Sequence, residues 1–170
     1  MHPIIATLPV ILPNNVGYLF KLPIRKKYME KLRIVADMAA DIFHTGHINL
    51  FINARKYFSP LPIKIIVALH TDEQIEEYKK KPVMKFADRK EILLSCRYVD
   101  EVIQAPDKFD LAFIQQFDYL VHGDDILTWE QELVDKFYLV ANQQNKLVLL
   151  PYTNGISSSS LKNSIGQHVW

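Results

Sequence analysis

The chain has 170 residues, of which 49% are hydrophobic and 23% are charged. This length predicts one domain with a substantial core and leaves too little chain for two. The formal net charge of +1 provides no overall field that would attract nucleic acid or an anionic membrane, so any basic site should be local. The one cysteine, Cys96, excludes an internal disulfide framework and favours a reducing, cytoplasmic compartment.

The first part of the chain is apolar but interrupted by prolines, which are Pro3, Pro9, Pro13 and Pro23. Because proline breaks helices, this stretch cannot form a membrane-spanning helix. No basic residue precedes it, which argues against a signal peptide. We expect an N-terminal extension over residues 1–30 and one domain over residues 31–170, without stable membrane insertion.

From residue 31 onward, apolar runs and helical patterns alternate. The predicted elements are a strand at 32–39, a helix at 47–58, a strand at 63–69, a helix at 88–96, a strand at 98–103, a short helix at 110–116, a strand at 117–123, a helix at 129–145, a strand at 146–151 and a helix at 157–165. Strands that are continuously apolar are typical of a parallel sheet covered on both faces. The alternation therefore predicts an α/β fold with a single Rossmann-like, doubly wound parallel sheet.

Polar segments follow four of the predicted strands. These segments are "DIFHTGH" at 41–47, "HTDE" at 70–73, "HGDD" at 122–125 and "YTNGIS" at 152–157. In doubly wound sheets, ligands bind outside the carboxyl ends of the strands, where the strand order reverses. We therefore expect all four segments to line one crevice.

The segment "DIFHTGHINL" allows three interpretations. His44 and His47 with Asp41 could bind zinc, although histidines three residues apart also match many helix faces. Alternatively, Gly46 permits close backbone approach, and the imidazoles and free N–H groups of a helix start could hold a phosphate and its transition-state charge. The third interpretation is that one histidine simply caps the helix.

A second possible anion site lies in "YTNGISSSSL", residues 152–161. Gly155 allows a tight turn, after which Ser157, Ser158 and Ser159 begin a helix with hydroxyl and amide groups available. Serines there are ordinarily caps, but two such sites in one short chain favour phosphate binding. The run of lysines at 79–81 is either a solvated face or a mobile loop that neutralises a polyphosphate.

Several separated blocks resemble the cytidylyltransferases that act on phosphoethanolamine, phosphocholine and glycerol 3-phosphate, which share an HxGH motif with other nucleotidyltransferases. The blocks are "DIFHTGHINL", "HTDEQIEEYKKKPVM", "DRKEILLSCRYVDEVI", "FDYLVHGDDI" and "LPYTNGISSSSL", and the resemblance covers residues 32–165. It implies transfer of a cytidylyl group from CTP to a small phosphorylated alcohol, with phosphoethanolamine favoured, by in-line attack that releases pyrophosphate. Mg²⁺ would assist the triphosphate.

The resemblance also implies roles by matching position. His44, His47 and Lys79 would be catalytic. The residues implied in nucleotide binding are Asp41, His44, Gly46, His47, Asp124, Asp125, Tyr152, Gly155, Ile156, Ser157, Ser158 and Ser159. Arg97 and Asp100 match a segment similar to the family's subunit contact, which implies a homodimer; the alternative is an internal pair between these two residues.

The chain departs from the family pattern at several positions. Tyr152 stands where the family has an arginine, Met38 and Ala40 replace a glycine and a phenylalanine, and Lys80 replaces a glycine. Lys80 could restore the charge that is missing at Tyr152. The other hypotheses are a slow enzyme, an adenylyltransferase of the same superfamily, and a protein that binds nucleotide without catalysis.

Overall fold

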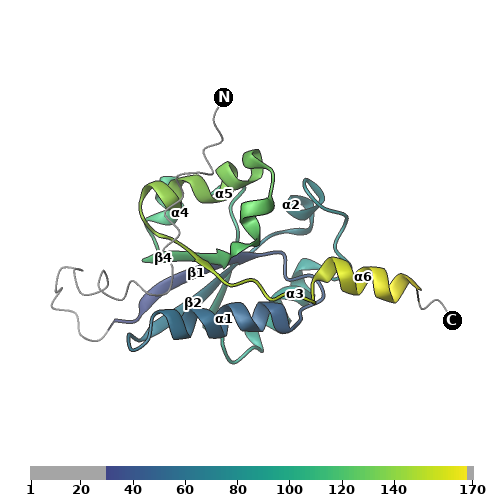
Figure 1. Ribbon diagram of the computed structural model, residues 1–170, viewed down its shortest axis with the longest axis horizontal. Coiled ribbons are helices and arrows are strands. Elements are labelled where there is room, and N and C mark those ends of the chain that lie inside the picture. Colours follow the sequence, from purple (N-terminus) through teal and green to yellow (C-terminus); the bar gives the residue numbers. More distant parts are fainter. Residues whose placement is uncertain (1–29, 168–170) are drawn as a thin grey trace.

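The computed structural model of the protein describes residues 30–167, so the predicted extension lies outside the described residues except for Glu30. One sheet of five strands forms the centre of the molecule (Figure 1). The strands are β1 (Leu32–Met38), β2 (Ile63–Leu69), β3 (Glu101–Gln104), β4 (Tyr119–Gly123) and β5 (Leu147–Leu150). All neighbours pair in parallel, in the order β3-β2-β1-β4-β5. The doubly wound prediction is confirmed, and the strand order reverses between β1 and β4.

Helices cover both faces of this sheet. They are α1 (Thr45–Tyr57), α2 (Asp72–Glu76), α3 (Phe86–Leu94), α4 (Leu111–Ile114), α5 (Gln131–Gln143) and α6 (Ser158–Gln167), with a 3₁₀ helix, η3, at Asp124–Thr128. In Figure 1, α1 and α3 lie on one face and α4 and α5 on the other, while α6 extends beyond the sheet. Each face therefore has its own hydrophobic core.

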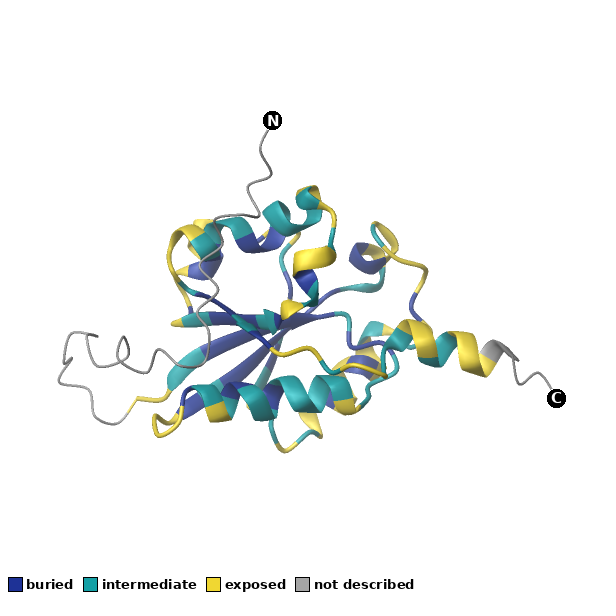
Figure 2. Ribbon diagram, viewed as in Figure 1, coloured by how far each residue is buried: buried dark blue, intermediate teal, exposed yellow. Residues whose placement is uncertain are grey.

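Alternation along the strands divides side chains between these cores. Ile34 and Ala36 of β1 pack on the side of Phe51 from α1, whereas Val35 packs on the side of Phe137 from α5. All these side chains are buried, as are the strands drawn in dark blue in Figure 2. Burying one such large apolar side chain stabilises the fold by about 1.5–3 kcal/mol. The same alternation puts Asp37 on the α5 side.

Two short helices, α2 and η3, were not predicted. In the polar segment "HTDE", Thr71 caps α2 in a reciprocal capping box: its hydroxyl accepts from the Gln74 backbone amide, and the Gln74 side-chain oxygen accepts from the Thr71 backbone amide. The strand predicted at 98–103 begins only at Glu101. The Asp100 carboxylate there accepts from the Ile65 amide and pairs with Arg55, which holds the preceding residues in a turn.

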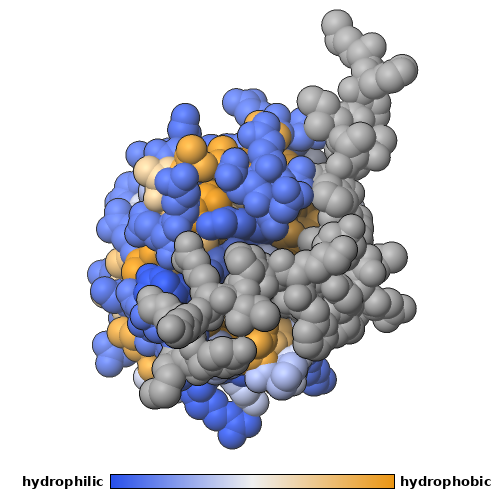
Figure 3. Space-filling model, turned by 90° about the vertical axis from the view of Figure 1, so that its left-hand side faces the viewer, coloured by the Kyte–Doolittle hydropathy of each residue, from blue (hydrophilic) through white to orange (hydrophobic). Residues whose placement is uncertain are grey.

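No helix within residues 30–167 has the length and apolar character needed to cross a membrane. Among the residues coloured by hydropathy in Figure 3, hydrophilic side chains predominate, with smaller hydrophobic areas between them. A cavity lies elsewhere, at the carboxyl ends of the strands.

Candidate active site

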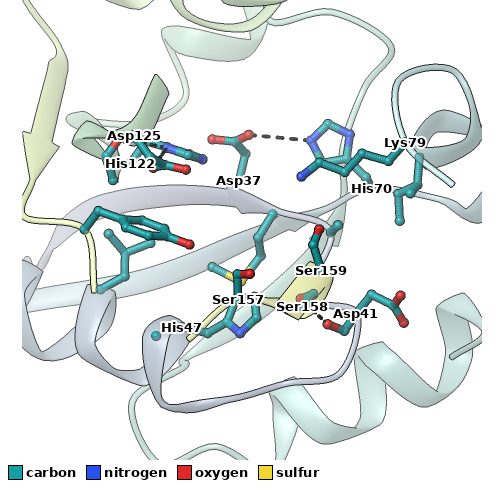
Figure 4. A pocket seen from close by; sticks show the side chains of 18 of the residues that line it. Asp37, Asp41, His47, His70, Lys79, His122, Asp125, Ser157, Ser158 and Ser159 are labelled. Atoms are coloured by element: carbon teal, nitrogen blue, oxygen red, sulfur yellow. Dashed lines mark hydrogen bonds and ion pairs between the residues drawn. The ribbon is translucent and has the colours of Figure 1, made fainter. Parts of the chain in front are cut away.

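A cavity of about 780 Å³ lies at the carboxyl ends of the strands, where the strand order reverses. All four predicted polar segments reach it, through His47, His70, His122 and Tyr152 among others. The expected single crevice is therefore confirmed. Figure 4 shows that its labelled side chains converge from β1, α1, β4, the start of α6 and the segments that follow β1, β2 and β4.

Most of the predicted site residues line this cavity. Those that do are Asp41, His44, Gly46, His47, Lys79, Lys80, Asp125, Tyr152, Ser157, Ser158 and Ser159. Three predicted residues, Asp124, Gly155 and Ile156, are not among its lining residues. Gly155 adopts a φ of +84°, so it shapes the turn before α6 in a conformation that favours glycine.

The two histidines of "HTGH" form a reciprocal cap at the start of α1. His44 is the cap residue, and its Nδ1 accepts from the Gly46 amide at 3.1 Å. The Nδ1 of His47 accepts from the His44 amide at 3.2 Å. A Cβ on residue 46 would lie 2.7 Å from Cε1 of His44, so glycine is required for this close approach.

This arrangement determines which nitrogen of each ring can donate. Because both Nδ1 atoms accept hydrogen bonds, each neutral ring carries its proton on Nε2. Burial lowers the pKa of His44, and burial with the nearby charges of His44 and Lys79 lowers the pKa of His47 to about 3. Both rings are therefore neutral N–H donors at neutral pH. The helix-cap and phosphate-clamp interpretations are thus compatible.

Asp41 connects three segments around the cavity. Its carboxylate accepts from the amides of Val83 and Met84 at 3.0–3.1 Å, and it pairs with Lys162 of α6 at 2.5 Å. Its flanking residues Ala40 and Ile42 have φ values of 52° and 51°, a strained conformation that turns the Asp41 side chain inward.

These contacts hold the Asp41 carboxylate in its charged form. Burial would raise its pKa, but the hydrogen bond and charge of Lys162 and the two amides hold that pKa below its usual range. The carboxylate is thus occupied within the chain, which removes the third ligand of the zinc interpretation. No group of three or more His, Cys, Asp or Glu side chains within residues 30–167 could hold a metal ion.

The start of α6 forms the second predicted anion site. Ser157 accepts from the Ser160 amide, and the Ser160 hydroxyl in turn accepts from the Ser157 amide. Ser158 donates to the backbone carbonyl of Asp41. Ser157, Ser158 and Ser159 all line the cavity, so the serine-rich start of α6 faces the same space as the histidines.

The deep part of the cavity contains a carboxylate that belongs to none of the polar segments after the strands. Asp37, at the end of β1, is 4% exposed; its Oδ2 accepts from the Tyr138 hydroxyl at 2.9 Å and lies 3.5 Å from Nε2 of His70. Within the described chain its Oδ1 has no hydrogen-bond partner. Burial would raise its pKa, but the charges of His122 and His70 and the hydrogen bonds of His70 and Tyr138 hold that pKa below its usual range.

Aromatic rings line the same cavity as this carboxylate. Trp129 packs edge-on against His122 with ring centroids 5.2 Å apart. The ammonium of Lys79 lies 5.5 Å from the centroid of Trp129 and 5.6 Å from that of Tyr78. Burial lowers the pKa of Lys79, an effect that the carboxylates of Asp125 and Asp37 oppose. The cavity therefore combines aromatic faces, an unpaired carboxylate oxygen and a lysine.

Tyr152 lies at the rim of the cavity, 39% exposed. Its amide donates to the Asp124 carboxylate at 2.9 Å, so Asp124 fixes the backbone after β5 rather than lining the cavity. A Cβ on Gly123 would lie 2.5 Å from Oδ1 of Asp125 and 3.3 Å from the Tyr152 ring. Gly123 therefore allows these two side chains to approach β4 closely.

The alternative to a subunit contact, an internal pair between Arg97 and Asp100, is not formed among the described residues. Asp100 pairs with Arg55 at 3.1 Å, and Arg97 donates to the hydroxyl of its neighbour Tyr98. Arg55 lies on α1, where its spacing from the "CRYVDEVI" block gave no signal of this contact. Homodimer formation through this segment stays a prediction.

Comparison with known proteins agrees with this geometry. A family model described as Cytidylyltransferase-like matches residues 39–164. The probable ethanolamine-phosphate cytidylyltransferase of Schizosaccharomyces pombe is 34% identical over 134 residues, covering 77% of this chain and 35% of that protein. The glycerol-3-phosphate cytidylyltransferase of Bacillus subtilis is 36% identical over 136 residues, covering 78% of this chain and 96% of that protein.

The relatives do not share one acceptor. The probable choline-phosphate cytidylyltransferase of S. pombe is also 30% identical over 133 residues, covering 76% of this chain and 36% of that protein. The matched region is thus only about a third of the length of both S. pombe relatives.

A solved structure supports the fold. The lipopolysaccharide core biosynthesis protein from Thermoplasma volcanium GSS1 superposes with a TM-score of 0.57 and 18% identity, covering 74% of this chain and 100% of that one. At this identity the likeness concerns the fold alone. The match of the family model across most of the chain, together with the named relatives, shows that this chain belongs to the cytidylyltransferase-like family.

Proposed function

We propose that this chain transfers a cytidylyl group from CTP to a phosphorylated alcohol, with phosphoethanolamine as the favoured acceptor, and releases pyrophosphate. One observation carries the proposal: His44 and His47 are held as neutral rings with Nε2–H donors beside a cavity that also contains the serine-rich start of α6. Such groups are suited to binding phosphate oxygens without needing to change protonation state.

The chemistry follows from this placement. An oxygen of the acceptor phosphate bonds to the α-phosphorus of CTP, while the bond from that phosphorus to the bridging oxygen breaks and its electron pair leaves with pyrophosphate. Charge on the phosphoryl oxygens redistributes during this in-line step. The imidazole N–H groups and the ammonium of Lys79 would stabilise that charge, so catalysis consists mainly of positioning and charge neutralisation.

We propose that Mg²⁺ accompanies the triphosphate. In proteins this ion usually keeps several waters and is bound through substrate phosphates and one or two carboxylates. Asp125 fits this role by its chemistry, because it lines the cavity and its Oδ1 has no hydrogen-bond partner within residues 30–167. The ion would supply charge neutralisation for the leaving pyrophosphate.

Asp37 supports a cationic acceptor. A buried, ionised carboxylate with one unpaired oxygen is costly unless a cation or donor meets it. A primary ammonium brings three N–H donors together with its charge, whereas a quaternary ammonium brings no donor. These features favour phosphoethanolamine over phosphocholine and over the uncharged glycerol moiety.

Thermal shift experiments test this proposal in two steps. CTP with Mg²⁺ should raise the melting temperature more than ATP does, because a ligand that binds the native state stabilises it by mass action. Phosphoethanolamine added with CMP should then raise it further than phosphocholine or glycerol 3-phosphate. Asp37→Asn should remove the larger shift with phosphoethanolamine than with the other two phospho-alcohols, while the shift caused by CTP should remain. Equal shifts with CTP and ATP would contradict the proposal.

A second candidate function is nucleotide binding without catalysis. It is favoured by Tyr152, which places a neutral, partly exposed ring where the resemblance implies an arginine. Binding of CTP without pyrophosphate release in the presence of all three phospho-alcohols would support this candidate.

We also infer that the protein is a homodimer. Ile92 and Leu94, which are 36% and 53% exposed, lie at the end of α3, a few residues before the Arg97–Asp100 segment, and exposed apolar residues beside such a segment favour a protein contact. Light scattering should give a dimer mass that Arg97→Glu reduces and the exposed control Lys108→Glu does not. A monomer mass for the unmodified chain at micromolar concentration would contradict the inference.

A further inference from the structure

The cavity contains a lysine that lies outside the sequence motifs and outside the proposed catalytic groups. Lys162 of α6 lines the cavity, and its side chain is only 26% exposed. It follows Ser158 by four residues, so both side chains lie on the same face of α6. Both also contact Asp41: Ser158 through the backbone carbonyl and Lys162 through the carboxylate. The ammonium is thereby held beside the serine-rich start of the helix.

Asp41 positions Lys162 without using all of its donors. A lysine ammonium has three N–H donors, and within residues 30–167 Asp41 is the one ion-pair partner that the structure gives to Lys162. The carboxylate does not depend on Lys162 alone, because the Val83 and Met84 amides also donate to it. Lys162 can therefore turn part of its ammonium toward an anion in the cavity while Asp41 keeps hydrogen-bond partners.

Further observations concern the place of this ammonium relative to Lys79 and the way in which α6 is attached. The charge of Lys162 is felt at Lys79, whose pKa is lowered first by burial and additionally by Lys162. Residues 158–165 of α6 include no fully buried side chain, so polar contacts such as those to Asp41 hold the helix in place. In Figure 1 most of α6 extends away from the sheet, which leaves its first turns as the part that meets the cavity.

We propose that Lys162 is a phosphate-binding residue of the nucleotide site, positioned by Asp41, which supplies positive charge to the outer phosphates that Tyr152 does not provide. The inference rests on the proposed nucleotide-binding function. It assigns the charge to a fixed lysine, in contrast to Lys80, which lines the same cavity but is exposed. A side chain that is already held in place loses less conformational entropy on binding.

Calorimetry with CTP and CMP at fixed Mg²⁺ tests this inference. Lys162→Gln should weaken CTP binding by about ten- to a hundredfold, as expected for loss of a charge-assisted contact. Binding of CMP, which lacks the outer phosphates, should change by less than about threefold. The matched control is Lys81→Gln, which changes an 81% exposed lysine that does not line the cavity and should leave both affinities unchanged.

Asp41→Asn distinguishes contact with phosphate from simple anchoring of α6. The amide oxygen can still accept from Val83 and Met84, but the ion pair is lost. If Lys162 binds phosphate, this variant loses much less of the CTP-to-CMP affinity ratio than Lys162→Gln does, because the ammonium retains its charge although it is no longer held by the ion pair. If Lys162 only anchors the helix, Asp41→Asn and Lys162→Gln lower the ratio alike, and the inference is overturned.

Two other outcomes are decisive. If the CTP-to-CMP affinity ratio falls in Lys80→Gln and not in Lys162→Gln, the positive charge on the outer phosphates comes from Lys80, and the inference is overturned. If the unmodified protein prefers ATP to CTP, the cytidylyl proposal fails, and the same variants are measured with ATP and AMP. A selective loss of ATP affinity in Lys162→Gln would then still support the role of Lys162.

Discussion

At the scale of single residues, the cap and the clamp interpretations of "HTGH" describe one arrangement. Each Nδ1 accepts a backbone hydrogen bond, and each Nε2–H is consequently free to act in the cavity. Spacing alone could predict a helix start at His44, but it could not reveal the tautomers, which depend on three-dimensional hydrogen bonds.

Substitutions at His44 can separate its two roles. Serine is a good cap residue, so His44→Ser should retain most of the stability that His44→Ala loses, a difference of about 1 kcal/mol. Both variants remove the imidazole donor and should lower kcat by on the order of 10²-fold with a smaller effect on the KM for CTP. Urea unfolding and steady-state kinetics measure the two effects. Near-normal kcat in His44→Ser would show that His44 serves only as a cap.

The lowered pKa of His47 predicts a pH dependence of stability. Its pKa falls from an ordinary value of 6.5 to about 3 in the folded protein, chiefly because of burial. Between these values the unfolded chain binds more protons, so stability is complete above about pH 6.5 and declines as the pH falls toward 3.

The matched variant for this prediction is His47→Gln, because glutamine also suits the third position of a capping box. It should flatten the fall in melting temperature between pH 7 and pH 5. Calorimetric scans across this range would measure it, and parallel curves for the two proteins would contradict the expectation.

Tyr152 allows a gain-of-binding experiment. Tyr152→Arg should tighten CTP binding more than CMP binding, because a guanidinium at the rim can reach the outer phosphates. The expected gain is about tenfold, the lower part of the range for a charge-assisted contact, because Lys162 already carries one positive charge there. Calorimetry gives the affinity ratio. An unchanged ratio would show that the chain already compensates fully for the missing arginine.

At the scale of secondary-structure elements, strands were easier to predict than the short helices beside them. The apolar runs of β1 and β2 differ sharply from their flanks, whereas α2 begins in polar residues and depends on its capping box. Asp37 could have been noticed as the acidic residue within the run "LRIVADMA". Its pairing with Tyr138 of α5 spans 101 residues, and periodicity carries no information on contacts of that kind.

Arg89 joins several of these elements beneath the site. It is 1% exposed, donates to the carbonyls of Ala39, His70 and Met84, and pairs with Asp72 at 2.5 Å. Its side chain therefore fixes the ends of β1 and β2 relative to the loop that carries Lys79.

Removing this arginine should be strongly destabilising. Arg89→Met should lower the free energy of unfolding by about 3 kcal/mol or more, because it leaves buried carbonyls and a carboxylate without their partner. The neighbouring exposed control, Lys90→Met, should change it by less than about 0.5 kcal/mol. Urea denaturation measures both. Equal stability of the two variants would contradict the role given to Arg89.

At the scale of the whole molecule, the topology predicts where the site lies. Alternating strands and helices led to a doubly wound sheet, and the cavity lies at the reversal of strand order between β1 and β4. The sequence could not predict how α6 attaches, because its contact through Lys162 and Asp41 joins residues 121 positions apart. The proposed acceptor preference also rests on distant contacts, since Asp37 lies on β1 and its partner Tyr138 on α5.

The most direct test of the account is pyrophosphate release by the full chain, measured with CTP or ATP in combination with each of the three phospho-alcohols and Mg²⁺. The account predicts the highest kcat/KM for CTP with phosphoethanolamine, and a loss of that activity in His47→Ala. Faster release with ATP, or no release with CTP and any of the three acceptors, would contradict it.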